Sequence, residues 1–147
     1  MRFTQRTHTA VAALLLASAA SAPTVAGTSC EELSGRWMNE NGSVLEIDSV
    51  TSEGRLQGRY HSSTGVDGRV FDLQGWVNRQ DEGVAAIAWT VRWTGYASIT
   101  SWTGSCDVVD QSPRIKTLWH LVRPDQEFDW ERIIANGSTF RPEPAAP

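Results

Sequence analysis

The side chains best suited to chemistry in this chain of 147 residues are uncharged hydrogen-bonding groups interleaved with tryptophan. Seven Trp stand against only four Phe and two Tyr. An indole is a flat, rigid wall with a single N–H donor, so this excess favours a ligand site or an interface over a core that needs only apolar volume. The candidate binding residues are Asn39, Ser43, Tyr60, Ser62, Trp93, Ser98, Thr100, Trp102, Trp119, Leu121 and Ser138.

Short strands must position these residues. Turn pairs such as Asn41-Gly42, Asp67-Gly68, Thr94-Gly95 and Ser112-Pro113 recur along the chain, and segments rich in Val, Ile, Thr and Trp lie between them. This spacing is typical of an antiparallel sandwich or an up-and-down barrel, and 125–133 has room for at most one helical turn. The predicted strands are 35–39, 43–50, 55–62, 69–77, 84–93, 97–109, 114–123 and 131–140.

Alternation along the strands separates two faces. The candidate residues share one parity, and the other parity carries charged residues such as Glu46, Arg59 and Lys116, which face solvent or a partner subunit. Only 69–77 is ambiguous. A set of inward hydroxyls and amides without partners is costly, so it indicates a polar, mostly neutral ligand walled by indoles. The alternative is that these groups bond to one another and to buried water.

Other functional classes fit less well. His61 and His120 fall on the outward parity and no Gly-x-Ser-x-Gly motif occurs, so we expect no enzyme and no catalytic residue. Widely spaced Cys and His make no metal motif, and we expect neither a metal nor a cofactor. With 13 Lys and Arg against 17 Asp and Glu, and no basic stripe, nucleic acid is not an expected partner.

The start of the chain predicts export. Residues 1–26 carry Arg2 and Arg6, then a short apolar run and small residues, which is the pattern of a secretory signal peptide. A membrane anchor or a lipidated Cys30 are weaker alternatives, so a secreted or periplasmic protein with no membrane partner is expected. The remainder, 27–147, forms one domain with a Pro-rich tail at 141–147. In such a compartment Cys30 and Cys106 predict one disulfide, although two unpaired thiols stay open.

Several motifs resemble the avidin and streptavidin family when taken in order. Gly35-Arg-Trp-Met-Asn39 with the hairpin to Ser43 resembles its opening, and Gly58-Arg-Tyr60-His-Ser62 its third strand. Trp89 to Trp93 and Thr100 to Cys106 are similar to its fifth and sixth strands. Lys116 to Leu121 is similar to the seventh, and Asp129-Trp130 with Ser138-Thr-Phe140 to the tail. The resemblance covers about 33–141. It implies a closed eight-stranded antiparallel barrel with biotin in its open end, and possible biotin sequestration.

The resemblance also implies roles. Asn39, Ser43 and Tyr60 would bind the ureido oxygen, Ser62 and Ser138 the ureido N–H groups, and Thr100 the ring sulfur. Trp93, Trp102 and Trp119 would wall the ring with Leu121 beside it, while Ser98 and the loop 63–68 with Thr64 would receive the carboxylate. Trp130 would cap the site of a neighbouring subunit, which implies a homo-oligomer, a tetramer before a dimer. The disulfide between Cys30 and Cys106 agrees with the family's intrachain bridge.

Departures from the family pattern bear on affinity. Ser138 stands where the family has Asp or Asn, and Asn41 where it has Leu, although Asn136 on the predicted inward face is expected to compensate. We expect Trp37 and Trp89 to plug the closed end and Trp76 to lie at an intersubunit surface. The alternatives are a barrel-type protease inhibitor acting through its rim, or a lipocalin-like carrier, which would need a more apolar interior.

Overall fold

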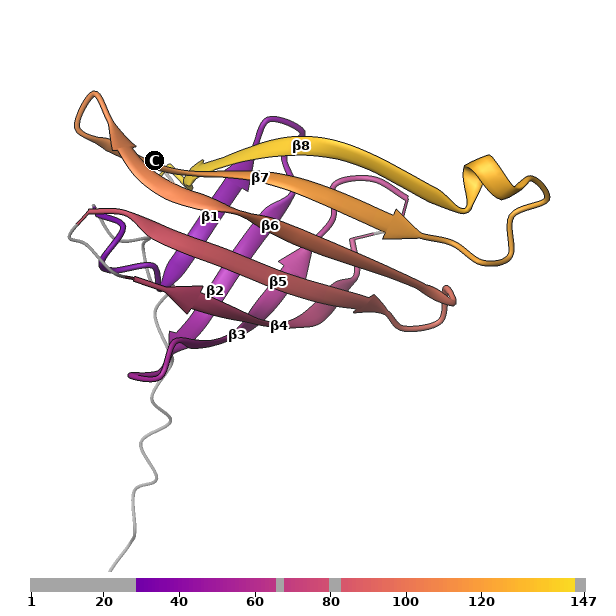
Figure 1. Ribbon diagram of the computed structural model, residues 1–147, viewed down its shortest axis with the longest axis horizontal. Coiled ribbons are helices and arrows are strands. Elements are labelled where there is room, and N and C mark those ends of the chain that lie inside the picture. The colour runs from indigo at the N-terminus through magenta and orange to yellow at the C-terminus, as the bar shows by residue number, and fades with distance from the viewer. Residues whose placement is uncertain (1–28, 66–67, 80–82, 145–147) are drawn as a thin grey trace, which may run out of the picture.

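The computed structural model describes residues 29–65, 68–79 and 83–144, which form a single closed antiparallel β-barrel (Figure 1). Each strand pairs with its sequence neighbours, and β1 closes the barrel on β8 through pairs such as Trp37 with Pro142. The predicted eight-stranded up-and-down barrel is therefore confirmed. Its strands are β1 (Gly35–Asn39), β2 (Val44–Val50), β3 (Arg55–His61), β4 (Val70–Asn78), β5 (Ala85–Trp93), β6 (Ser98–Val109), β7 (Ser112–Val122) and β8 (Ile133–Pro142).

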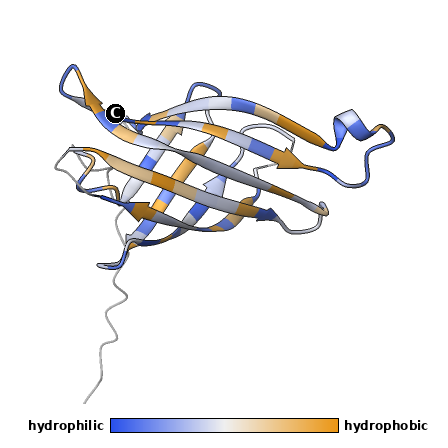
Figure 2. Cartoon of the chain, in the orientation of Figure 1, coloured by the Kyte–Doolittle hydropathy of each residue, from blue (hydrophilic) through white to orange (hydrophobic). Residues whose placement is uncertain are grey.

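Alternation of side chains, clearest along β3 and β5, separates the core from solvent (Figure 2). β5 alternates between buried and less buried positions from Ala85 to Trp93, as expected for a strand with one buried face. The ambiguity in β4 is resolved in the same way, because Phe71, Leu73 and Val77 are buried while Trp76 is 57% exposed. The inward row of β4 is thus the odd-numbered one.

The closed end of the barrel is filled by large side chains. Trp37 is fully buried and donates from its indole N–H to the carbonyl of Leu33, 2.9 Å away. Trp89 is also buried, and it stacks on Trp102 at 5.5 Å between ring centroids and meets the edge of Phe140. These buried rings form the floor of the barrel interior below its open end.

One predicted turn is wrong. The hairpin between β6 and β7 turns at Asp110-Gln111, both in the left-handed region at φ 50° and 63°, and not at Ser112-Pro113. Val109 pairs with Ser112 and Val108 with Pro113, so β7 begins two residues earlier than predicted. Two left-handed residues match the twist of a tight hairpin, and Asp is tolerant of that conformation.

The predicted disulfide is present between Cys30 and Cys106, 5.6 Å apart at their Cα atoms. It ties the segment before β1 to β6 near the closed end. At the other end of the chain β8 continues to Pro142, and the N–H of Glu143 donates to the carbonyl of Arg36. The tail expected from residue 141 therefore begins within strand β8, which ends at Pro142. The expected signal peptide, 1–26, lies outside the described residues.

The predicted helical turn is the short 3-10 helix η1 (Asp129–Glu131), in the segment that projects beyond the barrel between β7 and β8 (Figure 1). Arg123 holds this segment by donating to the carbonyl of Glu131, and Arg132 forms an ion pair with Asp129 at 3.0 Å. Among the described residues, no helix is long and apolar enough to cross a membrane.

Candidate ligand-binding site

A cavity of about 290 Å³ opens at the barrel end where β1, β3, β5 and β7 finish. That volume suits one small ligand. The strands bring inward residues from six of their number to it, because each strand contributes alternate side chains to the interior. It is lined by Asn39, Asn41, Ser43, Tyr60, Ser62, Thr64, Trp93, Thr100, Trp102, Trp119, Leu121 and Ser138.

The structure therefore brings together every candidate residue except Ser98 and Trp130. Ser98 begins β6 and is half-buried outside this lining, while Trp130 is 74% exposed and stacks on Phe128. Asn41, noted in the sequence only as a departure, joins the lining through the β1–β2 hairpin. The signal for this hairpin in the sequence is the pair Asn41-Gly42, and Gly42 adopts the left-handed conformation of such a turn at φ 80°.

The turn between β1 and β2 orients Asn39. Its Oδ1 accepts the backbone N–H groups of Asn41 at 3.0 Å and Ser43 at 2.9 Å. Two backbone donors aimed at one atom identify it as the oxygen, because an amide NH₂ cannot accept them. The NH₂ of Asn39 is thus the group left to donate to a ligand.

Ser43 and Tyr60 lie beside this amide. The Oγ of Ser43 accepts the backbone N–H of Ser63 at 3.1 Å, which ties the hairpin to the chain after β3. Burial raises the pKa of Tyr60 to about 12, the charge of Glu40 adds to that rise, and a hydrogen bond with Ser43 opposes it. A phenol is protonated at neutral pH even at its ordinary pKa near 10, and the raised pKa of Tyr60 keeps it a hydrogen-bond donor into more alkaline solution.

Two indole N–H groups are already engaged. Trp93 donates to the Oγ1 of Thr100 at 2.8 Å, and Trp119 donates to the Oγ of Ser138 at 3.2 Å. Each hydroxyl oxygen that accepts an indole N–H keeps its own proton and a second lone pair. Thr100 and Ser138 can therefore each make a further hydrogen bond inside the cavity.

The walls are aromatic. The rings of Tyr60 and Trp102 are 4.9 Å apart, and Tyr60 meets Trp93 edge-on at 5.9 Å. These contacts between rings order the aromatic wall of the cavity. None of the cavity's lining side chains is charged. The site combines a rigid apolar wall with neutral donors and acceptors.

Asn136 does not compensate for Ser138, contrary to expectation. Its side chain is exposed and its Oδ1 accepts the N–H of the next residue, Gly137, at 2.8 Å. The residue lies near the start of β8, where the strand has run past the barrel rim and both of its faces are exposed. Alternation alone could not reveal this, because parity predicts a direction but not where the barrel ends.

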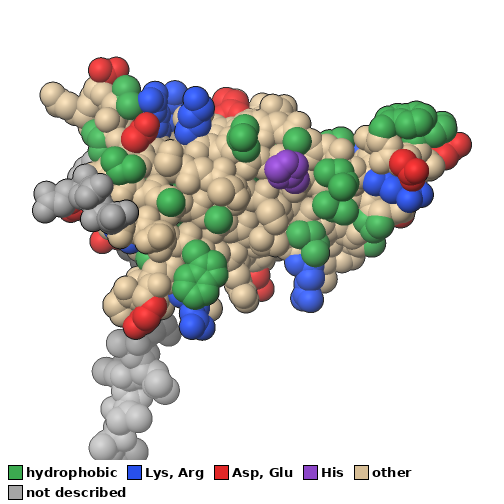
Figure 3. Space-filling view, in the orientation of Figure 1, with side chains coloured by type: hydrophobic (Ala, Val, Ile, Leu, Met, Phe, Trp, Pro, Cys, Tyr) green, Lys and Arg blue, Asp and Glu red, His purple; other side chains and the backbone are tan. Residues whose placement is uncertain are grey.

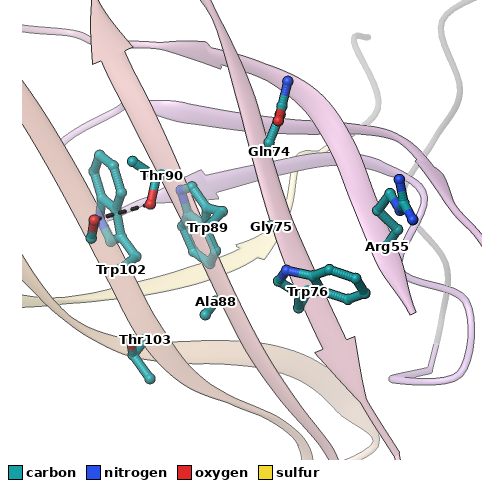
Figure 4. Close-up of a pocket in the computed structure, with 10 residues that line it drawn as sticks. Arg55, Gln74, Gly75, Trp76, Ala88, Trp89, Thr90, Trp102 and Thr103 are labelled. Carbon is teal, nitrogen blue, oxygen red and sulfur yellow. Dashed lines mark hydrogen bonds between the residues drawn. The ribbon is translucent and has the colours of Figure 1, made fainter. Parts of the chain in front are cut away.

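A larger hollow of about 550 Å³ lies on the outer face of β3 to β6 (Figure 4). Its floor is made of small residues around Gly75, with Trp76 and Arg55 at one side and the hydrogen bond between Thr90 and Ser101 (3.0 Å) at another. Arg55 covers the Trp76 ring at 5.6 Å. This hollow lacks the convergent donors of the barrel cavity, so the cavity is the better candidate for a small-molecule site.

No group of three or more His, Cys, Asp or Glu that could hold a metal ion occurs within the described part of the chain. The histidines predicted to face outward do so. His61 contacts Glu46 at 3.1 Å on the outer wall, within an ion-pair cluster that also contains Arg36 and Arg59. This cluster joins β1, β2 and β3 outside the cavity.

Comparison with known proteins agrees with the geometry. The model of the avidin family matches residues 27–143. Avidin-related protein 4/5 of Gallus gallus is 29% identical over 133 residues, covering 86% of this chain and 87% of its own, and avidin of Gallus gallus is 28% identical over 128 residues, covering 80% and 82%. The crystal structure of xenavidin has a TM-score of 0.68 at 30% identity, covering 77% of this chain and 98% of its own.

Proposed function

This chain belongs to the avidin family, and we propose that it binds biotin, without chemical change, in the open end of its barrel. The observation that carries the proposal is the convergence of three uncharged donors from neighbouring strands. Asn39, Ser43 and Tyr60 all line the same cavity, and the phenol of Tyr60, whose pKa burial raises to about 12, is a donor at neutral pH. Such a group suits a single strongly polarised carbonyl oxygen, as in the ureido ring of biotin.

The remaining lining residues complete the proposed pose. Ser62 and Ser138 accept the two ureido N–H groups, and Thr100 donates toward the ring sulfur. Trp93, Trp102 and Trp119 enclose the bicyclic ring with Leu121, and Thr64 lies toward the carboxylate tail. The neutral lining supports binding over catalysis, since it offers no acid–base pair for a reaction.

Ser138 sets a limit on the proposed affinity. Its Oγ already accepts the N–H of Trp119, so it offers a ureido N–H only its second lone pair. A weaker acceptor costs about 1 kcal/mol or more relative to a carboxylate or amide oxygen. We therefore place the affinity below the limit of non-covalent binding, for which biotin–streptavidin is a standard example.

Titration by calorimetry tests the proposal directly. We expect one biotin per chain, a large drop in affinity in Trp119→Ala and Tyr60→Phe, and none in the control Gln74→Ala, which alters only the outer hollow. A protein that is folded by circular dichroism but gives no heat and no competition with labelled biotin would overturn the proposal. Loss of binding in Gln74→Ala alone would move the site to the outer face.

We further propose that the protein works as a homotetramer in which Trp130 caps a neighbour's cavity. The exposed aromatic pair of Phe128 and Trp130 supports this, as does the 70% exposed Leu118 on the outer face of β7. Figure 3 shows apolar side chains at the tip of the projecting segment, beyond the barrel body. Light scattering after size-exclusion chromatography tests it. A dimer would correct the number of subunits, and a biotin-binding monomer would contradict the shared site.

Export and sequestration complete the proposal. The disulfide supports an oxidising compartment, in which the protein withholds biotin from other organisms. The purified protein should slow the growth of a biotin auxotroph, and added biotin should restore it. Unaltered growth at protein concentrations above that of biotin would contradict this role.

A further inference from the structure

Arg69 continues the inward row of β4 past the barrel rim. Phe71 and Leu73, two and four residues further on, are both buried inside the barrel, so alternation directs position 69 over the mouth and not along the outer wall. Arg69 itself is exposed, directly before β4 begins at Val70. Its side chain therefore belongs to the rim of the cavity, although it is not part of the cavity lining.

Contacts across the mouth hold this side chain. The guanidinium carbon lies 5.6 Å from the centre of the Tyr96 ring, in the turn between β5 and β6. A methyl group placed on Gly95 would lie 3.7 Å from its Nη1. Arg69 thus spans from the start of β4 to the β5–β6 turn, with a cation–π contact that orders its guanidinium, and no residue in the described ranges accepts a hydrogen bond from its N–H groups.

Three rings connect that guanidinium to the cavity wall. Tyr96 meets Phe71 edge-on at 6.3 Å, and Phe71 meets Trp93 edge-on at 4.9 Å. Trp93 lines the cavity. The position of Arg69 is therefore set by the same aromatic packing that shapes the site.

The charge of Arg69 is not neutralised by a described residue. Arg36, Arg59, Arg114 and Arg132 each form an ion pair with a carboxylate, but no carboxylate in the described ranges lies within 4.0 Å of the Arg69 guanidinium. The cavity lining is uncharged as well. A ligand that places an anionic group at the mouth would meet an ordered cation there.

We propose that Arg69 is a specificity-determining residue that binds the ionised carboxylate of the ligand's tail at the barrel mouth. The inference rests on the proposed function and extends it, because Ser98, which the resemblance assigns to the carboxylate, does not line the cavity. A guanidinium matches a carboxylate with two parallel N–H donors, and Tyr96 holds it ready for that geometry. The protein consequently prefers ligands with a free acid over neutral esters of the same ring system.

Paired titrations of biotin and biotin methyl ester test this preference. We expect Arg69→Gln to weaken biotin about tenfold and to leave the ester within twofold, so that the acid-to-ester ratio falls about tenfold. The loss should shrink at 1 M NaCl, since screening acts on an exposed charge pair. Tyr96→Ala, which removes the platform but keeps the charge, should give a smaller loss in the same direction.

Arg92→Gln is the matched control. It makes the same change in net charge on the outer face of β5, and should leave the acid-to-ester ratio unchanged. An unchanged ratio in Arg69→Gln, or equal losses for acid and ester, would overturn the role of Arg69 while leaving biotin binding established. If the wild-type protein bound neither compound, the proposed function itself would fail, and this inference with it.

Discussion

At the scale of single residues, several polar groups of the cavity are held by hydrogen bonds within the protein and still keep a donor or a lone pair for a ligand. The side-chain oxygen of Asn39 accepts two backbone N–H groups of the β1–β2 hairpin, and its NH₂ group is left to donate to a ligand. Thr100 and Ser138 each accept one indole N–H and keep a proton. Pre-ordering of this kind removes rotamer entropy before binding, so less is lost when the ligand arrives.

Replacing Ser138 tests this hydrogen-bond balance. Ser138→Asn supplies an amide oxygen that accepts both the Trp119 N–H and a ureido N–H, so we expect biotin affinity to rise about three- to tenfold, or ~1 kcal/mol. Ser138→Ala removes the acceptor of both hydrogen bonds, from the Trp119 N–H and from the ureido N–H, and should weaken binding by a similar factor. Competition titration of the two variants measures the difference. A weaker Asn variant would show that the pocket is too narrow for the longer side chain.

The pKa of Tyr60 predicts a loss of stability in alkali. Its pKa is about 12 in the folded protein, whereas the unfolded chain's Tyr ionises near 10. Between these values the unfolded state binds fewer protons, so the free energy of unfolding falls as pH rises. The expected fall from pH 9 to pH 11 is about 1 kcal/mol from this group.

Urea unfolding at pH 9 and pH 11 measures this fall in the free energy of unfolding. Tyr60→Phe should remove that part of the fall, while the control Tyr96→Phe, at the exposed rim, should retain it. An equal pH dependence in the wild type and in Tyr60→Phe would contradict the assignment to Tyr60.

At the scale of strands, glycines allow neighbouring backbones to approach inside the barrel. A Cβ on Gly104 of β6 would lie 2.0 Å from the carbonyl oxygen of Lys116 on β7, and one on Gly75 of β4 would lie 2.0 Å from that of Ala88 on β5. These contacts are with backbone, which a side-chain rotation cannot relieve. Close approach at these points leaves the interior volume to Trp89 and Trp102.

An added methyl group should therefore destabilise the barrel far more at Gly104 on β6 than at Gly137 on β8. We expect Gly104→Ala to lower the free energy of unfolding by roughly 3 kcal/mol. Gly137→Ala on β8, where the nearest atom is 3.3 Å away, should cost about 1 kcal/mol or less. Thermal and urea unfolding of the two variants measure this. Equal costs would mean that β6 and β7 can separate without loss.

At the scale of the whole molecule, the barrel has its support and its site at opposite ends. The disulfide and the rings of Trp37 and Phe140 lie toward the closed end, and the cavity opens at the other. A closed barrel has no unpaired edge strand, so its backbone bonds are satisfied without a partner. Stability and binding can therefore be altered separately.

Removing the disulfide tests that separation. The double change of Cys30→Ser and Cys106→Ser opens a crosslink between residues 76 apart, and should cost roughly 4 kcal/mol of stability. Biotin affinity at 25 °C should change by less than threefold as long as the barrel stays folded. Urea unfolding and competition titration on the same sample measure both. A large loss of affinity in a folded variant would show that the two ends are coupled.

The strands, their order and the inward row of polar and aromatic residues follow from the sequence alone. Turn residues and a period of two are local properties, and each depends on only a few neighbouring side chains. Asn39, Tyr60 and Trp119 were assigned to one interior face for this reason. The disulfide likewise followed from compartment and cysteine number.

Only the tertiary structure decided where the barrel ends and what lies beyond its rim. Asn136 and Arg69 both have inward parity, yet one is exposed on an overrunning strand and the other reaches across to Tyr96. The same holds for the partners of Thr100 and Ser138, since indole N–H groups from neighbouring strands reach them only through register. Register and the level of the rim are set by pairing along all eight strands at once, and a local pattern cannot contain that information.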